Sequence, residues 1–103
     1  MKRFIVSPEA EDDLLGLWRY LVETADSIVA DRIQDELLDS FEAIARTPGL
    51  GHMRQDLTHH NVYCHRLYQY MIVYRKGNPI EIVGVLHGKR DIKRKLKGRL
   101  ASA

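Results

Sequence analysis

The strongest constraint on the fold is a pair of apolar stripes at helical spacing, separated by a break of only about three residues. The first stripe consists of Ala10, Leu14, Leu17, Trp18, Leu21 and Val22, and the second of Val29, Ile33, Leu37, Phe41, Ile44 and Ala45. This spacing is typical of one face of an amphipathic helix. We expect the first helix to run to about Glu23, with the break at residues 24–26. Because so short a connection joins neighbouring helices, the sequence predicts an antiparallel helical hairpin.

Both ends of this hairpin carry local signals. The segment KRFIVS at 2–7 is typical of a strand, and Ser7-Pro8 then supplies an N-cap followed by a proline at the first helical position. At the other end, TPGLG at 47–51 ends the second helix, because a proline cannot continue it and the glycines permit a tight turn. A strand is therefore predicted before the hairpin and a turn after it.

The chain beyond this turn is rich in β-branched and aromatic residues. Three segments have this composition: 61–66, 70–75 and 80–87. Gly77-Asn78-Pro79 indicates a turn between the last two, so we expect an antiparallel meander. The consecutive apolar residues of these strands indicate that both sheet faces are covered, with the hairpin on one side. After Gly88 the chain becomes polar, and the spacing of Ile92 and Leu96 predicts a short final helix.

Length and composition favour one globular domain covering residues 1–103, with a basic C-terminal tail at 88–103. A chain of 103 residues with 45% hydrophobic and 29% charged residues is close to globular averages. The predicted fold class is α+β: an N-terminal strand, an antiparallel helical hairpin and a three-stranded meander form one sheet with the helices on one face. Trp18 and Phe41 should be largely buried, and Leu37 should face the core.

The sequence also favours a cytoplasmic protein. No apolar run reaches the roughly 20 residues that a membrane helix needs, and no secretory apolar region follows Met1. Cys64 is the only cysteine, so the chain forms no internal disulfide, in agreement with a reducing compartment. We expect Cys64 to be a packed thiol.

Charge is strongly separated along the chain, although the net charge is only +2. Residues 9–42 hold eleven acids and two arginines, a net charge of −9, and residues 87–99 hold seven bases and one acid, a net charge of +6. The acidic stretch is interpreted as a solvated face whose carboxylates also favour the helix N-termini. The basic stretch is where an anionic partner is expected to bind, although a solvated basic face is the alternative.

Five segments together resemble the ParE/RelE superfamily of toxins from type II toxin–antitoxin systems. They are VSPEAEDDLLGLWRYL, the long second helix, TPGLGHMRQDL, YMIVYR, and IEIVGVLHGKRDI near the end. The likeness covers almost the whole chain and is closer to the ParE branch than to the RelE branch. It implies a toxin that inhibits DNA gyrase by binding, with possible contact to DNA, and that a ParD-like cognate antitoxin neutralises. It implies no cofactor, and it implies a role in plasmid stabilisation.

The alternative implied by the RelE branch is a messenger-RNA endonuclease, which needs acid/base groups beside cations. Arg54, Arg66, His87 and Arg90 are the residues that would serve it. The resemblance also places basic residues in the loop and strand after the second helix in such nucleases, an arginine near the end of the last strand, and often a tyrosine or histidine near the C-terminus. Residues 47–66 contain no lysine and no tyrosine follows Tyr74, so the usual set is incomplete.

Histidine could fill this gap, because imidazole titrates near neutral pH. His52, His59, His60 and His65 are nevertheless interpreted as structural or solvent-exposed residues. His59 and His60 are adjacent, so in a strand they would point to opposite faces. No HxH or HxxxH pair is present and Cys64 and His65 are neighbours, so no metal site is expected.

The residues at the end of the last predicted strand are the better candidates, because Gly88 lets the backbone turn sharply there. We expect the target-binding residues to be Arg66, His87, Arg90, Lys93, Arg94 and Lys95. The alternatives remain a hydrogen-bonded structural role for His87, a local pair of Arg90 with Asp91, and a surface role for Arg66. Tyr68 and Tyr70 could stack on bases, but filling of the core is favoured for them.

Three functions therefore remain open: a gyrase inhibitor that is not an enzyme, a messenger-RNA endonuclease, and a binding module that is no longer toxic. For the first two, the expected partner is an antitoxin with an acidic and apolar C-terminal segment. Such a segment would fold along apolar strips of the hairpin and meet the basic edge. The antitoxin-binding residues themselves are not predicted.

Overall fold

The computed structural model describes residues 3–100, except for the side chain of Lys89. Lys2 of the predicted first strand and residues 101–103 of the predicted basic tail lie outside the described residues. The elements are β1 (Phe4–Val6), α1 (Pro8–Thr24), α2 (Ser27–Arg46), the 3-10 turn η1 (Pro48–Leu50), β2 (Tyr63–Leu67), β3 (Tyr70–Arg75), β4 (Ile80–Leu86) and α3 (Lys89–Leu100). The predicted elements are all present and in the predicted order.

The two helices of the hairpin begin at side-chain caps. The Ser7 Oγ accepts a hydrogen bond from the Ala10 N–H at 3.1 Å, and Pro8 occupies the first turn, as the sequence predicted. In α2, the Asp26 Oδ1 accepts from the Val29 N–H at 2.8 Å. Each cap satisfies a backbone donor that has no partner within its helix, which fixes where that helix starts.

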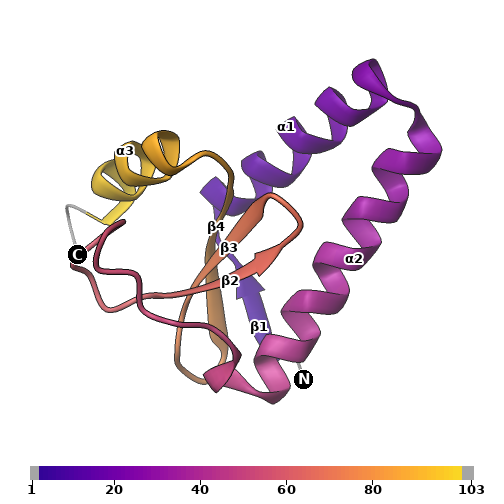
Figure 1. The fold of residues 1–103 in the computed structure, drawn as a ribbon. Coiled ribbons are helices and arrows are strands. Elements are labelled where there is room, and N and C mark those ends of the chain that lie inside the picture. The colour runs from indigo at the N-terminus through magenta and orange to yellow at the C-terminus, as the bar shows by residue number, and fades with distance from the viewer. Residues whose placement is uncertain (1–2, 101–103) are drawn as a thin grey trace.

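The four strands form one mixed sheet in the order β1-β4-β3-β2 (Figure 1). The segments β2, β3 and β4 form the predicted antiparallel meander, with pairs such as Cys64 with Val73 and Ile72 with Val85. The short strand β1 pairs in parallel with β4, so the chain's first and last strands are neighbours. The α+β class and the single sheet are therefore confirmed.

The sheet is covered on both faces by different helices. The hairpin packs on one face, where Leu37, Phe41 and Ile44 meet Ile72, Tyr74 and Ile82. The opposite face is covered by α3, whose apolar residues meet those of β2, β3 and β4 (Figure 1). Successive strand residues point to opposite faces, so this arrangement explains the nearly continuous burial of β3 and β4.

Phe41 and Leu37 are fully buried, as predicted, whereas Trp18 is buried less completely. Trp18 is only partly buried, and its indole N–H donates to the Asp31 Oδ1 at 2.9 Å in an exposed position. The outer end of the hairpin projects beyond the sheet (Figure 1), so α1 has no third layer to pack against there. Ala10 is the one fully buried residue of α1. Helical periodicity shows on which face of a helix a residue lies, but not whether another element packs against that face.

Candidate functional site

Helix α3 is fixed on the sheet by one apolar stripe. Ile92, Leu96 and Leu100 are 4%, 0% and 1% exposed, and they pack in a cluster that includes Cys64 and Val83. Residues four apart lie on the same side of a helix, so this stripe leaves the other positions of α3 toward solvent or neighbouring segments. The basic residues of the chain's end are therefore held on a rigid helix rather than on a loose tail.

A partly buried ion pair fastens α3 to the rest of the fold. Arg99 donates from Nη1 and Nη2 to the two carboxylate oxygens of Asp13, at 2.7 Å each, and from Nη1 to the Val83 carbonyl at 3.0 Å. Asp13 also accepts from the Val85 N–H at 3.0 Å. The side chains of Arg99 and Asp13 are 16% and 7% exposed, and the hydrogen bonds from Arg99 to Asp13 raise the pKa of Arg99. Three elements, α1, β4 and α3, are joined at this pair.

Sequence reasoning missed this pair. Asp13 was grouped with a solvated acidic face and Arg99 with the basic tail, whereas each neutralises the other. The two residues are 86 positions apart, and no local pattern marks residues that meet only through the fold.

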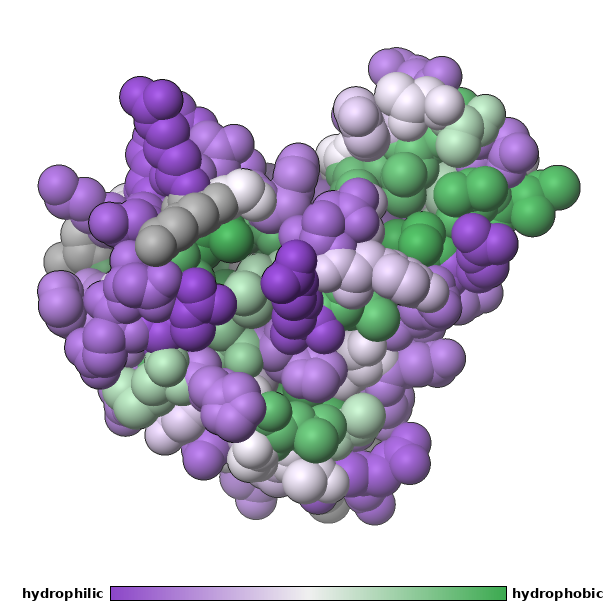
Figure 2. All heavy atoms as spheres, viewed as in Figure 1, coloured by the Kyte–Doolittle hydropathy of each residue, from purple (hydrophilic) through white to green (hydrophobic). Residues whose placement is uncertain are grey.

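Four cations form a second stripe on α3. Arg90, Lys93, Arg94 and Lys97 are all exposed and follow the spacing i, i+3, i+4, i+7, which places them on one side of the helix. They form one wall of a groove of about 660 Å³, whose other wall is the segment Leu57, Thr58, His59 and His60. We call these four residues the basic stripe and this hollow the basic groove. In Figure 2, hydrophilic side chains predominate over the region of α3.

The basic stripe contains three of the predicted target-binding residues and one that was not predicted. Lys97 follows Lys93 and Arg94 at helical spacing, so the sequence held a signal for it. His59 and His60 were also set aside, on the assumption that adjacent residues of a strand face apart. They precede β2 and lie outside any strand, and both line the basic groove.

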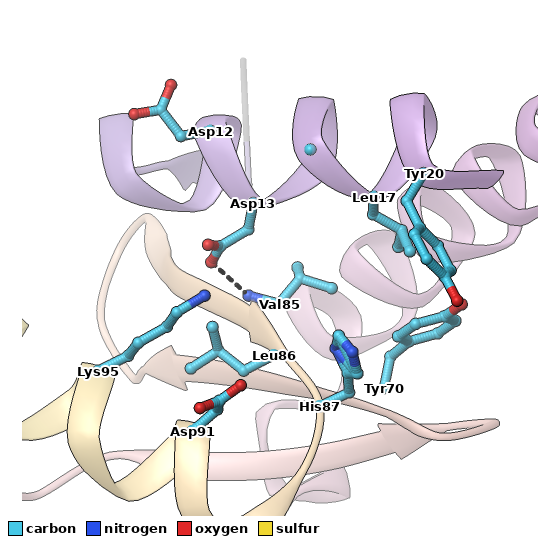
Figure 3. Close-up of a pocket in the computed structure, with 11 residues that line it drawn as sticks. Asp12, Asp13, Leu17, Tyr20, Tyr70, Val85, Leu86, His87, Asp91 and Lys95 are labelled. Carbon is cyan, nitrogen blue, oxygen red and sulfur yellow. Dashed lines mark hydrogen bonds between the residues drawn. The ribbon is translucent and has the colours of Figure 1, made fainter. Parts of the chain in front are cut away.

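Lys95 and His87 lie in a different hollow from the basic stripe. This hollow, of about 280 Å³, lies between α1, the end of β4 and α3, and it is lined by Asp12, Asp13 and Asp91 as well as by Tyr20 and Tyr70. Figure 3 shows Lys95 extending toward Asp13 and His87 lying beside Tyr70. The ring of His87 meets Tyr70 edge to face, with 6.0 Å between centroids. Lys95 therefore lies among carboxylates, unlike the stripe.

Arg66 lies on the same sheet face as α3, near the helix start. Strand alternation puts it with Cys64, which packs in the cluster beneath α3. Through the pairs Arg66 with Met71 and Met71 with Leu86, it lies level with the end of β4. Strands about 4.8 Å apart place it roughly 10 Å from Leu86. Arg66 is exposed, and its Nε donates to the Tyr68 carbonyl at 2.8 Å.

The four residues considered for a nuclease do not share one hollow. Arg90 lines the basic groove and His87 lines the hollow beside α1, while Arg54 and Arg66 line neither. Arg54 is held by Asp56 through two hydrogen bonds of 2.8 Å. General acid/base catalysis requires its groups within reach of one reacting centre. In the described part of the chain, Arg54, Arg66, His87 and Arg90 are not gathered around one such centre.

The two tyrosines after Arg66 have different environments. Tyr70 is 4% exposed and packs in the core, as the sequence favoured. Tyr68 is 54% exposed, so filling of the core was the wrong interpretation for it. It lies in the β2–β3 turn with a φ of 55°, and its hydroxyl donates to the Glu36 Oε1 at 2.7 Å. This hydrogen bond raises the pKa of Tyr68 and links the turn to α2.

Residues 3–100 contain neither a cluster of metal ligands nor a membrane-spanning helix. No three His, Cys, Asp or Glu side chains among them are grouped as a metal site requires. None of the helices in this part of the chain is long and apolar enough to cross a membrane.

Comparison with solved structures identifies the class of fold. The chain is similar to one in the structure titled "Chromosomal ParDE TA system from P. aeruginosa", with a TM-score of 0.70 and 16% sequence identity, over 82% of this chain and 92% of that one. At this identity the likeness shows a shared α+β fold. Comparison with curated proteins found no match.

Comparison with protein-family models identifies the family. Residues 4–92 match the model described as the ParE toxin of the type II toxin–antitoxin system, parDE. The chain therefore belongs to the ParE toxin family, as its resemblance had predicted.

Proposed function

We propose that this chain inhibits DNA gyrase by binding it, without breaking a covalent bond, and that a cognate ParD-like antitoxin neutralises it in the cytoplasm. Membership of the ParE toxin family is the observation that carries the proposal. The residues assigned to the target are Arg66, His87, Arg90, Lys93, Arg94 and Lys95.

The position of these residues supports binding rather than catalysis. Arg90, Lys93 and Arg94 stand in a row on a helix whose opposite side is buried, so their charges are held in place before the target arrives. A preorganised row of cations favours encounter with an anionic assembly such as gyrase on DNA. The scattered nuclease set, in contrast, offers no acid/base pair at one hollow.

The antitoxin has an apolar surface available on the side of the hairpin. Ile5 of the edge strand β1 is 46% exposed and Leu38 of α2 is 44% exposed. Both line a hollow of about 630 Å³ between β1 and the two helices. Further exposed apolar residues, Leu15, Tyr20 and Ile28, lie on the hairpin, and Figure 2 shows hydrophobic side chains gathered at its outer end. An acidic and apolar antitoxin segment would cover such strips and meet the basic edge.

A supercoiling assay with purified gyrase tests the proposal. The purified chain should inhibit supercoiling and cause cleaved DNA to accumulate, and addition of the antitoxin should relieve the inhibition. The double variant Lys93→Ala, Arg94→Ala should weaken the inhibition of gyrase without abolishing it. Arg19→Ala removes an exposed cation of α1 and serves as the control, which should inhibit like the wild type.

The opposite result is equally clear. If gyrase were unaffected while ribosome-bound messenger RNA was cut at specific sites, and the cuts disappeared in His87→Ala, the chain would be a nuclease and the proposal would be wrong.

A further inference from the structure

We propose that the basic groove binds the phosphodiester backbone of duplex DNA, so that the toxin contacts DNA directly. This inference deepens the proposed function and rests on the same basic surface, because it names the ligand of part of that surface. It concerns Arg90, Lys93, Arg94 and Lys97 on one wall and His59 and His60 on the other.

The spacing of the basic stripe fits a DNA strand. From residue 90 to residue 97 a helix rises about 10.5 Å. Duplex DNA carries one phosphate per about 3.4 Å of axis on each strand, so this length along the axis is about three steps and includes about four phosphates. The four cations over that length are enough to pair with each of these phosphates.

The basic stripe is free to exchange its partners. Its side chains are exposed, and the ion pair of Arg94 with Asp91, at 3.1 Å, joins side chains that are 74% and 54% exposed. Such surface pairs contribute little to stability. A phosphate can therefore replace Asp91 at little cost. The contrast is Arg99, which stays engaged with Asp13 at 16% exposure and is not part of the stripe.

The opposite wall of the groove is also held in place. Leu57 is 5% exposed and Val62 is 1% exposed, so both anchor the segment beneath α3. Backbone hydrogen bonds from the N–H groups of Leu57 and Thr58 to the Arg54 carbonyl, at 2.9 and 3.1 Å, form a turn at the start of this segment, and the Val62 N–H donates to the His60 carbonyl at 2.9 Å at its end. His59 and His60 are exposed between these two anchors, and imidazole nitrogens can donate hydrogen bonds to phosphate oxygens.

The chemistry of the groove favours DNA over an acidic peptide. A peptide that folds on its partner is anchored by apolar side chains in apolar pockets. The large apolar side chains that are exposed in the described part of the chain, such as Ile5, Leu38 and Ile28, do not line this groove. Six of its eight lining residues carry a cationic or imidazole group, and the apolar surface between these groups comes from the hydrocarbon parts of these side chains, from Thr58 and from the buried Leu57.

Fluorescence anisotropy with a labelled 20-base-pair duplex, in the absence of gyrase, tests the inference. Four phosphate contacts predict a slope of about −3.6 for log K against log salt, so affinity should fall roughly 150-fold between 50 and 200 mM salt. In the triple variant Lys93→Ala, Arg94→Ala, Lys97→Ala the fall should be only roughly 3-fold. Arg19→Ala, with one exposed cation removed on α1, should bind like the wild type.

A second variant tests the groove rather than α3 alone. His59→Ala with His60→Ala should weaken binding about fivefold at constant salt, as expected for the loss of one net hydrogen bond. Unchanged binding in this variant would overturn the groove as the site. Each variant should retain the fold, because all of these side chains are exposed, and circular dichroism checks this.

Three other results would overturn the inference. They are no duplex binding by the wild type, a preference for single-stranded RNA of the same length, and a triple variant that loses antitoxin binding but keeps duplex binding. Gyrase inhibition is measured in a separate assay, so a failure of the proposed function can be distinguished from a failure of this inference. A chain that binds DNA through the stripe but leaves gyrase active would support this inference and contradict the proposed function.

Discussion

Replacing Asp13 with alanine should lower the free energy of unfolding by about 3 kcal/mol. The change removes the acceptor of two Arg99 hydrogen bonds of 2.7 Å and of the Val85 N–H. Removing one partner of a buried pair costs about 3–5 kcal/mol, because the other charge is left uncompensated. Arg99 keeps 16% exposure and its bond to the Val83 carbonyl, which puts the cost at the lower end.

The assay is urea unfolding followed by circular dichroism. The midpoint should fall while the slope against urea stays constant, since the surface exposed on unfolding is unchanged. A loss of about 3 kcal/mol corresponds to a fall in melting temperature of roughly 12–24 °C for a domain of this size. Asp91→Ala is the matched control: its pair with Arg94 is exposed, so it should cost less than about 1 kcal/mol.

A double-mutant cycle with Arg99→Ala isolates the pair. The two single losses should add to clearly more than the loss in the double variant, because the second change removes a charge that the first left unpaired. If Asp13→Ala cost no more than Asp91→Ala, or if the single losses were additive, the pair would not be what fastens α3.

Three further predictions concern the core and its cysteine. Tyr74→Phe should cost about 1–3 kcal/mol in urea unfolding, because it leaves the Pro48 carbonyl and the Gly51 N–H without the hydroxyl that they contact at 2.6 and 2.9 Å. Leu37→Ala should cost about 2–5 kcal/mol, and its neighbour Leu38→Ala, at 44% exposure, less than about 0.5 kcal/mol; equal losses would contradict the layer assignment. Cys64 is 4% exposed and burial raises the pKa of its thiol, so Ellman's reagent should modify it roughly 100-fold or more slowly in the native chain than in guanidinium.

The parts of the fold that the sequence predicted are those that local chemistry determines. The Ser7 cap, the hairpin stripes and the turn at Pro48 each depend on residues within a few positions of one another. The buried sites of α3 at Ile92 and Leu96 were predicted for the same reason. Boundaries differed by one or two residues, because the ends of strands depend on their neighbours in the sheet.

The features that the sequence did not predict are non-local. The parallel pairing of β1 with β4 joins residues about 76 positions apart, such as Ile5 and Glu81. The bond of Asp13 with Arg99 spans 86 positions. Neither periodicity nor composition contains information on which distant residues meet. The candidate site was predicted only in part for this reason: its helix and most of its cations were identified, but not its second wall.

The charge of the C-terminal segment has a different meaning once it is folded. When charges are counted along the sequence alone, every base of this segment counts equally toward the attraction of an anionic partner. In the structure, Arg99 is neutralised by Asp13, and Lys95 lies in a hollow with three carboxylates. The charge that remains for a partner is concentrated in the basic stripe, on the side of α3 that faces the 57–60 segment. Arg99 joins α3 to α1 and β4 in addition to the apolar stripe, so this arginine stabilises the position of the helix while the basic stripe stays exposed to a partner.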